Sequence, residues 1–236
     1  MALQADESEA TFAALRLTMV ECQIRTFGVT DHAVIAQFLA VPREKFVPAA
    51  VRDLAYSDTA LKIVDAKLGG PERRLLPPLV LARLIQAAEI KPTDRVLDVA
   101  PGTGYSTAIL AGLAQSITAL ESDPDLQAAT KANLAAAGLG AIPVVGGPLH
   151  EGVASAAPFD VILVNGAVED HLGQLFAQLR DGARLLTLSR VANSVDRLTC
   201  RAVAFEKNSG EISTRTLFDA SAPLLPEFRK EPAFVF

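Results

Sequence analysis

One segment, a short apolar strand followed by a glycine turn, constrains the fold of this chain most strongly. The segment Arg95–Tyr105 reads RVLDVAPGTGY, with Asp98 near the end of the apolar run and two glycines in the turn that follows. Glycine lets the backbone approach a ligand closely because no Cβ intervenes. A second apolar run, Ile117–Leu120, ends in Glu121. An acid at the end of the second strand of a βαβ unit can hold two ribose hydroxyls. The sequence therefore predicts a nucleoside-bearing cofactor on a doubly wound sheet.

Composition places the chain among globular proteins and narrows its partners. The 236 residues are 50% hydrophobic and 21% charged, with a formal net charge of −5. That balance gives no general attraction for nucleic acid or anionic membranes, so neither is an expected partner. The only cysteines are Cys22 and Cys200, without metal-ligand spacing, so no metal is expected. The N-terminus lacks the basic region of a signal peptide and no apolar stretch is long enough to span a membrane, which favours the cytoplasm.

The C-terminal two thirds alternate strand and helix patterns, which predicts a mostly parallel sheet covered on both faces. Strands are expected at Arg95–Val99, Ser116–Glu121, Ile142–Val145, Phe159–Val164 and Arg184–Leu188, and helices at Leu79–Glu89, Tyr105–Leu113, Pro124–Ala137 and Glu169–Leu179. The runs Arg197–Glu206 and Glu211–Asp219 are joined by Lys207–Gly210, which indicates a closing antiparallel hairpin.

The N-terminal third has helical and loop signals instead. A helix is expected from Ser8 to about Thr26, stopped by Gly28, and Thr30 can cap a second helix. Residues 57–78 contain several glycines and prolines and are expected to form an ordered loop with little regular structure. We therefore divide the chain into an N-terminal helical extension with a loop (1–78), packed on the core, and a cofactor-binding domain (79–236).

Several motifs together resemble the protein-L-isoaspartate O-methyltransferase family, whose members depend on S-adenosylmethionine. The similarity covers about residues 18 to 225. Besides the glycine turn, it rests on MVECQIR at 19–25, VPREKFVP at 41–48, LAYSD at 54–58 and PFDVILV at 158–164. The resemblance implies a Rossmann-like class I methyltransferase fold: a doubly wound, mostly parallel seven-stranded sheet with a C-terminal antiparallel hairpin.

The same resemblance implies roles for residues at the cofactor site. Asp98 matches the acid that orients the methionine end of the cofactor, and Glu121 the acid that accepts both ribose hydroxyls. Tyr105 would pack over the cofactor or serve as a core aromatic, and Asn165 would line the active site or only form a turn. The expected cofactor contacts are Asp98, Ala100, Pro101, Gly102, Thr103, Gly104, Tyr105, Glu121, Ser122, Gly147 and Asn165.

Three positions depart from the family pattern. Ala100 replaces the first glycine of the turn, a modest change if its φ stays negative. Gly146–Pro148 lacks the aspartate that reaches the adenine amino group, a loss of about 0.5–1.5 kcal/mol in binding. The substrate loop reads ERRLLPP, with Arg74 and Leu76 at the positions of the family's threonine and serine, so the catalytic residues are not identified.

Arg73 and Arg74 of that loop have two interpretations. They can form a fork for a substrate carboxylate, or remain solvated loop charges. We expect transfer of a methyl group to a carboxylate of a protein, peptide or small molecule. A carboxylate is ionised at pH 7 and needs no general base, so proximity and orientation would supply most of the catalysis. The alternatives are a degenerate, non-catalytic binding or scaffold protein and, more remotely, a nicotinamide-dependent oxidoreductase.

Overall fold

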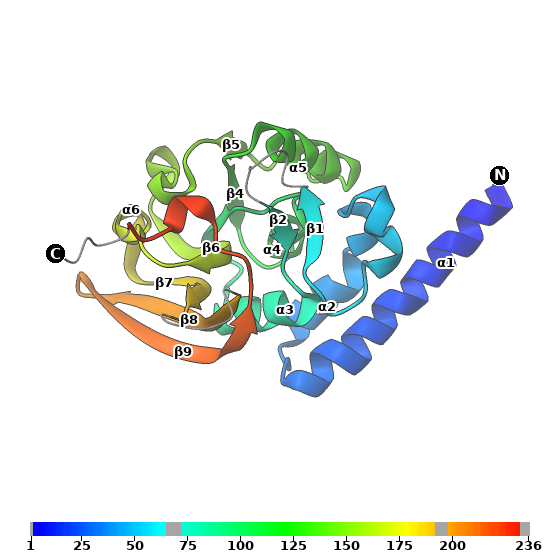
Figure 1. The fold of residues 1–236 in the computed structure, drawn as a ribbon, viewed down its shortest axis with the longest axis horizontal. Helices are drawn as coiled ribbons and strands as arrows, with labels where there is room; N and C mark the ends of the chain where they lie inside the picture. Colours follow the sequence, from blue (N-terminus) through cyan, green and yellow to red (C-terminus); the bar gives the residue numbers. More distant parts are fainter. Residues whose placement is uncertain (1, 65–71, 192–197, 232–236) are drawn as a thin grey trace.

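The computed structural model describes residues 2–64, 72–191 and 198–231 and contains the predicted α/β sheet (Figure 1). Within these residues the main sheet has seven strands in the order β5-β4-β3-β6-β7-β8-β9. Its strands are β3 (Arg95–Val99), β4 (Ser116–Glu121), β5 (Val144–Gly146), β6 (Phe159–Val168), β7 (Leu179–Arg190), β8 (Thr199–Asn208) and β9 (Glu211–Ser221). The strands from β5 to β7 run parallel, and β8 and β9 close the sheet antiparallel. The predicted fold class is confirmed.

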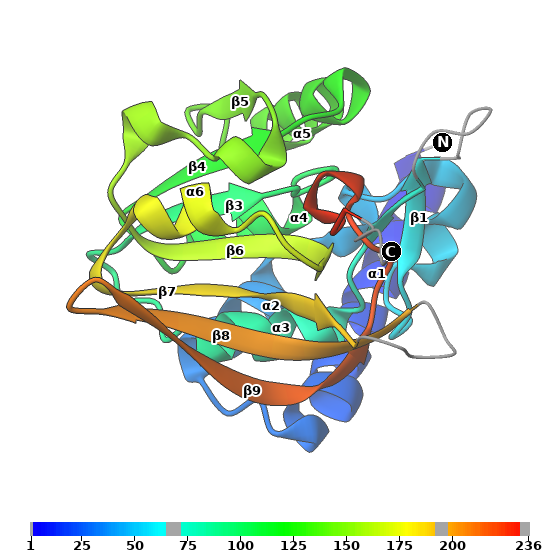
Figure 2. The ribbon, with the colours of Figure 1, turned by 60° about the vertical axis from the view of Figure 1, so that its left-hand side comes forward.

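The helices cover both faces of this sheet. They are α1 (Ala2–Met19), α2 (His32–Ala40), α3 (Pro78–Ala87), α4 (Tyr105–Ala111), α5 (Pro124–Ala136) and α6 (Gly173–Ala177). The face that includes Val96 and Val161 packs against α2, α3 and α4, and the face that includes Leu97 and Ile162 packs against α6. Figure 2 shows α6 and the α2–α3 pair on opposite sides of the sheet. Because both faces are covered, the central strands are apolar almost throughout.

The N-terminal segment contributes to the same core as the sheet. After α1 the chain continues through a π-helical turn (Val20–Ile24) and a 3-10 turn (Arg25–Phe27). This helical segment ends, as predicted, at Gly28, whose φ is 87°. Met19 and Ile24 are fully buried in the cluster that includes α3. The predicted cap of α2 was wrong. Asp31, not Thr30, accepts the backbone N–H groups of Ala33 and Val34, because its carboxylate lies one residue closer to the first turn.

The segment predicted to be an irregular loop instead contains a small antiparallel pair of strands, β1 (Leu61–Val64) and β2 (Arg73–Leu75). The short strands escape a pattern-based prediction because three or four residues carry too little alternation. The glycines of the predicted loop lie in 65–71, outside the described residues. Figure 1 shows β1 and β2 beside the ends of the central strands, at the edge where ligands bind in parallel α/β sheets.

Other boundaries also differ from the prediction, among them those of β5, which spans Val144–Gly146 instead of Ile142–Val145. The helix expected at Glu169–Leu179 is limited to Gly173–Ala177, and β7 already begins at Leu179. β6 extends to Val168, so Asn165 lies within a strand, at a register shift, rather than in a turn after it. The C-terminal hairpin is confirmed. Its turn residues Ser209 and Gly210 both have positive φ, and Arg197, at the start of the predicted run, lies outside the described residues. Within the described chain, we find no helix that is both long and apolar enough to cross a membrane.

Candidate active site

Asp98 lies near the carboxyl end of β3 and is completely buried. One oxygen accepts hydrogen bonds from the hydroxyls of Ser106 (2.8 Å) and Thr107 (2.6 Å), and the other accepts one from the Asn165 amide (2.6 Å). Burial raises the pKa of Asp98 to about 6, although these three donors act in the opposite direction. The carboxylate is therefore a preorganised, nearly desolvated acceptor at the end of the strand.

The turn after β3 adopts left-handed backbone conformations at three alternate positions. Ala100, Gly102 and Gly104 have φ values of 58°, 67° and 93°. Ala100 therefore lacks the negative φ at which replacing glycine by alanine would be a modest change. A residue with a Cβ at this φ is strained by roughly 1–2 kcal/mol. Ala100 thus holds a conformation that the family's glycine would adopt at lower cost.

Glu121, at the end of β4, is also fully buried, and its carboxylate is occupied by protein donors. Arg73 of β2 donates to its two oxygens at 2.8 and 2.9 Å in a bidentate pair. The backbone N–H groups of Gly102, Ser122 and Asp123 donate to the same carboxylate. With Arg73 only 6% exposed, its interpretation as a solvated loop charge is wrong, because the guanidinium is buried against an acid. Arg74 differs: it is exposed, and it contacts Glu72 and the carbonyl oxygen of Ala60.

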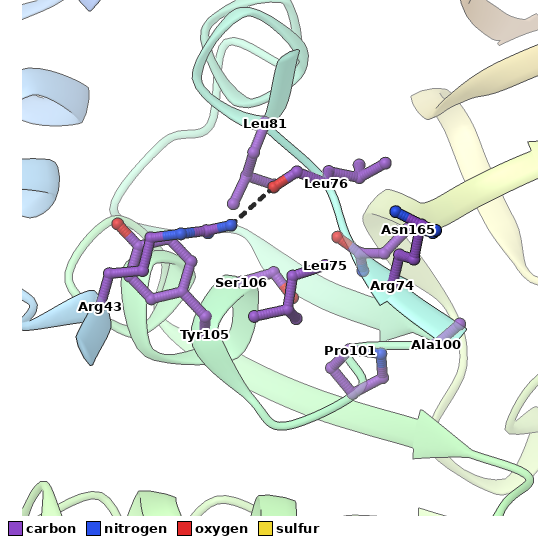
Figure 3. A pocket seen from close by; sticks show the side chains of 10 residues that line it. All are labelled: Arg43, Arg74, Leu75, Leu76, Leu81, Ala100, Pro101, Tyr105, Ser106 and Asn165. Carbon is purple, nitrogen blue, oxygen red and sulfur yellow. Dashed lines mark hydrogen bonds between the residues drawn. The ribbon is translucent and has the colours of Figure 1, made fainter. Parts of the chain in front are cut away.

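Side chains of β1 and β2 also cover the glycine turn. A Cβ at Gly102 would lie 2.4 Å from Cδ1 of Ile63 and 3.4 Å from Cδ2 of Leu75. Between the turn and β2 there remains a cavity of about 10 Å³, roughly the space of one water. It is bordered by Ala100, Pro101, Ser106 and Asn165 from the sheet side (Figure 3). The two carboxylates fit the chemistry expected of a cofactor with an ammonium group and two ribose hydroxyls. In this conformation, however, β1 and β2 fill the space above the turn.

Arg43 is a member of this site that sequence analysis missed. It is completely buried, passes over the Tyr105 ring with its Cζ 4.6 Å from the ring centroid, and donates from Nη2 to the carbonyl oxygen of Leu76 at 2.8 Å (Figure 3). Its Nε and Nη1 have no hydrogen-bond partner among the described residues, and burial lowers its pKa. Arg43 belongs to the VPREKFVP motif, which supported the family resemblance without assigning Arg43 a role.

Of the other predicted residues, some border this cavity and others do not. Tyr105 is fully buried among Phe38 and Phe46, as a core aromatic would be, and it also borders the cavity. The Thr103 hydroxyl donates to the Phe46 carbonyl, away from the cavity lining. Ser122 contributes its backbone N–H to Glu121, and Gly147 is half-buried after β5. Whether these residues contact a cofactor remains a prediction.

Comparison with known proteins gives this arrangement a family. The family model described as Protein-L-isoaspartate(D-aspartate) O-methyltransferase matches residues 16–218. This chain belongs to that family. Curated relatives named Protein-L-isoaspartate O-methyltransferase include one from Koribacter versatilis, 39% identical over 74% of this chain and 76% of its own length. Another, from Methylorubrum extorquens, is 40% identical over 74% of this chain and 73% of its own length.

Solved structures share the fold of this chain. A putative protein-L-isoaspartate O-methyltransferase from Plasmodium falciparum, in complex with S-adenosyl-L-homocysteine, aligns with a TM-score of 0.73 at 20% identity and covers 89% of this chain and 97% of that chain. A second protein-L-isoaspartate O-methyltransferase aligns with a TM-score of 0.77 at 22% identity, although this chain spans only 65% of its length. The family match and the curated relatives confirm the predicted S-adenosylmethionine-dependent methyltransferase class and cofactor, and they do not support the non-catalytic alternative.

Proposed function

We propose that this methyltransferase transfers its methyl group to the free carboxylate of an isoaspartyl residue in a protein or peptide. One observation carries the proposal: the buried acids Asp98 and Glu121 end adjacent parallel strands beside a cavity bordered by Arg43 and Arg74. Acids suit the cationic cofactor, and guanidinium groups suit an anionic acceptor. The relatives' shared name supports isoaspartyl carboxylates as the acceptor class.

The reaction requires the protein mainly to bind and orient the cofactor and the acceptor. S-adenosylmethionine, when bound, supplies an electrophilic methyl group. Asp98 would hold the methionine end of the cofactor, and Glu121 would hold its ribose hydroxyls. Hydrogen bonds from Asn165, Ser106 and Thr107 fix the orientation of Asp98. The acceptor carboxylate is ionised at neutral pH, so no residue must remove a proton from it.

The acceptor side of this site is more apolar and more cationic than the family motif. Leu75 and Leu76 are buried, and Leu76 stands where the family has a hydroxyl. They would exclude water, while guanidinium groups replace hydroxyls as donors to the acceptor. We propose that this exchange changes the preferred acceptor sequence rather than the reaction. A cytoplasmic location remains a prediction.

Methyl transfer to an isoaspartyl peptide tests the proposal directly. With tritiated S-adenosylmethionine, we expect base-labile methyl incorporation into the isoaspartyl peptide and none into the same peptide with a normal aspartyl residue. Incorporation into small carboxylic acids but not into peptides would instead establish a small-molecule acceptor. No transfer to any carboxylate, together with measurable S-adenosylhomocysteine binding, would refute the proposed reaction.

Arg43→Met should separate function from stability. A buried guanidinium with unpartnered nitrogens contributes little net stability, so a methionine of similar volume should change the free energy of unfolding by less than about 1 kcal/mol. If Arg43 orients the acceptor or the loop that holds it, kcat/KM for the isoaspartyl peptide should fall at least about tenfold. Urea denaturation and methyl-transfer kinetics measure the two effects. An unchanged kcat/KM would limit Arg43 to a packing role.

A further inference from the structure

Arg73 is bound to Glu121 as a guanidinium binds the carboxylate of a ligand. Both terminal nitrogens donate to the two carboxylate oxygens, and the side chains of Arg73 and Glu121 are 8% and 0% exposed. Such parallel, charge-assisted pairs are among the strongest hydrogen-bonded contacts in proteins. The pair joins strand β2 to the end of β4, 48 residues further along the chain.

The carboxylate of Glu121 has no capacity left for another ligand. A carboxylate offers about four acceptor positions, and Glu121 already accepts two hydrogen bonds from Arg73 and three from backbone N–H groups. The backbone donors belong to the glycine turn and the strand end, so they stay with Glu121. Two ribose hydroxyls could donate to this carboxylate only if Arg73 withdrew. Ile63, above Gly102, blocks the same approach from β1.

Among the described residues, the other acids around Arg73 already have partners of their own. Glu72 already pairs with Arg74, and Asp98 already accepts hydrogen bonds from Ser106, Thr107 and Asn165. A buried guanidinium deprived of its anion is costly and favours any carboxylate that can reach it. Arg73 also borders a small hollow shared with Leu76 and Asn165, on the acceptor side of the cavity.

We infer that Arg73 exchanges one carboxylate for another during the reaction cycle and is a positioning residue for the acceptor. In the cofactor-free protein it pairs with Glu121. When the ribose takes Glu121, the released guanidinium pairs with the carboxylate of the isoaspartyl acceptor. This inference rests on the proposed function, because it assigns the second partner of Arg73 to that acceptor. It requires the cofactor to bind before the acceptor.

Calorimetry with S-adenosylhomocysteine and an isoaspartyl peptide tests both halves of the exchange. Arg73→Gln removes the competitor for Glu121 and should tighten S-adenosylhomocysteine binding about fivefold or more. In the wild type, saturating S-adenosylhomocysteine should tighten binding of the peptide about tenfold, and Arg73→Gln should abolish that gain. A peptide carrying an α-carboxamide instead of the carboxylate should show no gain in either protein. Arg180→Gln, which removes a partly exposed guanidinium paired with Asp160 outside the site, is the control and should behave like the wild type.

Several outcomes would overturn the inference. Unchanged or weaker S-adenosylhomocysteine binding by Arg73→Gln would show that Arg73 does not compete with the ribose. Peptide binding that is independent of S-adenosylhomocysteine in the wild type would refute the exchange. Arg73→Lys, which keeps the charge but loses the fork, provides a second variant if Arg73→Gln does not fold, and it should also lose the peptide gain. If the wild type binds S-adenosylhomocysteine but methylates no peptide, the proposed function fails. The S-adenosylhomocysteine affinities of the wild type and Arg73→Gln still show whether Arg73 competes with the ribose for Glu121.

Discussion

Replacing Asp98 by asparagine is expected to weaken S-adenosylhomocysteine binding about a hundredfold. Asp98 is fully buried, and the asparagine would keep its shape while removing the charge that we expect to pair with the ligand's ammonium group. Loss of one member of a buried, hydrogen-bonded charge pair typically costs about 2–5 kcal/mol. Isothermal titration calorimetry measures the change. Asp94→Asn is the matched control: Asp94 is a largely buried acid beside the opposite end of β3, bonded to the Lys91 N–H, and its loss should leave the affinity unchanged.

The elevated pKa of Asp98 also predicts a pH dependence. Binding needs the carboxylate, so affinity should rise as pH increases through about 6 in the wild type and stay flat in Asp98→Asn. The sign for stability is the reverse. A folded pKa raised above the unfolded value of about 3.9 adds stability that is fully present below about pH 4 and is lost as pH rises through about 6. A pH-independent affinity in the wild type would contradict the assignment.

Local sequence patterns predicted the strands that carry the two acids. β3 and β4 have the predicted boundaries, because each is a mostly apolar run with an acid at or near its end and a turn after it. The glycine turn was predicted for the same reason. What its sequence could not provide was the backbone angle of Ala100, since alanine rarely adopts a positive φ and nothing local requires it.

Contacts between distant segments could not be predicted. Arg73 and Glu121 lie 48 residues apart in the sequence, and their pairing depends on β2 lying over the end of β4. Arg43 likewise donates to Leu76, 33 residues away, and lies over the Tyr105 ring, so its burial depends on segments that are distant in the sequence. Periodicity predicts which face of an element is apolar, but it does not predict which polar side chains a loop brings together. The sequence therefore predicted the positions of the two acids and named Arg73 and Arg74 as candidates, but it predicted neither the pairing of Arg73 with Glu121 nor the burial of Arg43.

Glu121→Ala is expected to lower the free energy of unfolding by about 3–5 kcal/mol, in addition to weakening S-adenosylhomocysteine binding at least tenfold. The substitution leaves the buried guanidinium of Arg73 and three backbone N–H groups without their acceptor. Adding Arg73→Met should recover part of the lost stability, because the unpaired charge is then removed as well. Urea denaturation followed by circular dichroism gives the coupling energy of the pair.

The exposed pair of Arg74 and Glu72 supplies the control for this cycle. Its side chains are 38% and 33% exposed, so Glu72→Ala should cost less than about 1 kcal/mol. A cost for Glu121→Ala as small as that of Glu72→Ala, with no recovery by Arg73→Met, would show that the buried pair does not form in solution. A large coupling energy would instead measure the interaction that cofactor binding must replace. The carboxylate of Glu121 would then either stabilise the fold by pairing with Arg73 or bind the ribose. A variant of Arg73 that gains affinity for the ribose should therefore lose stability.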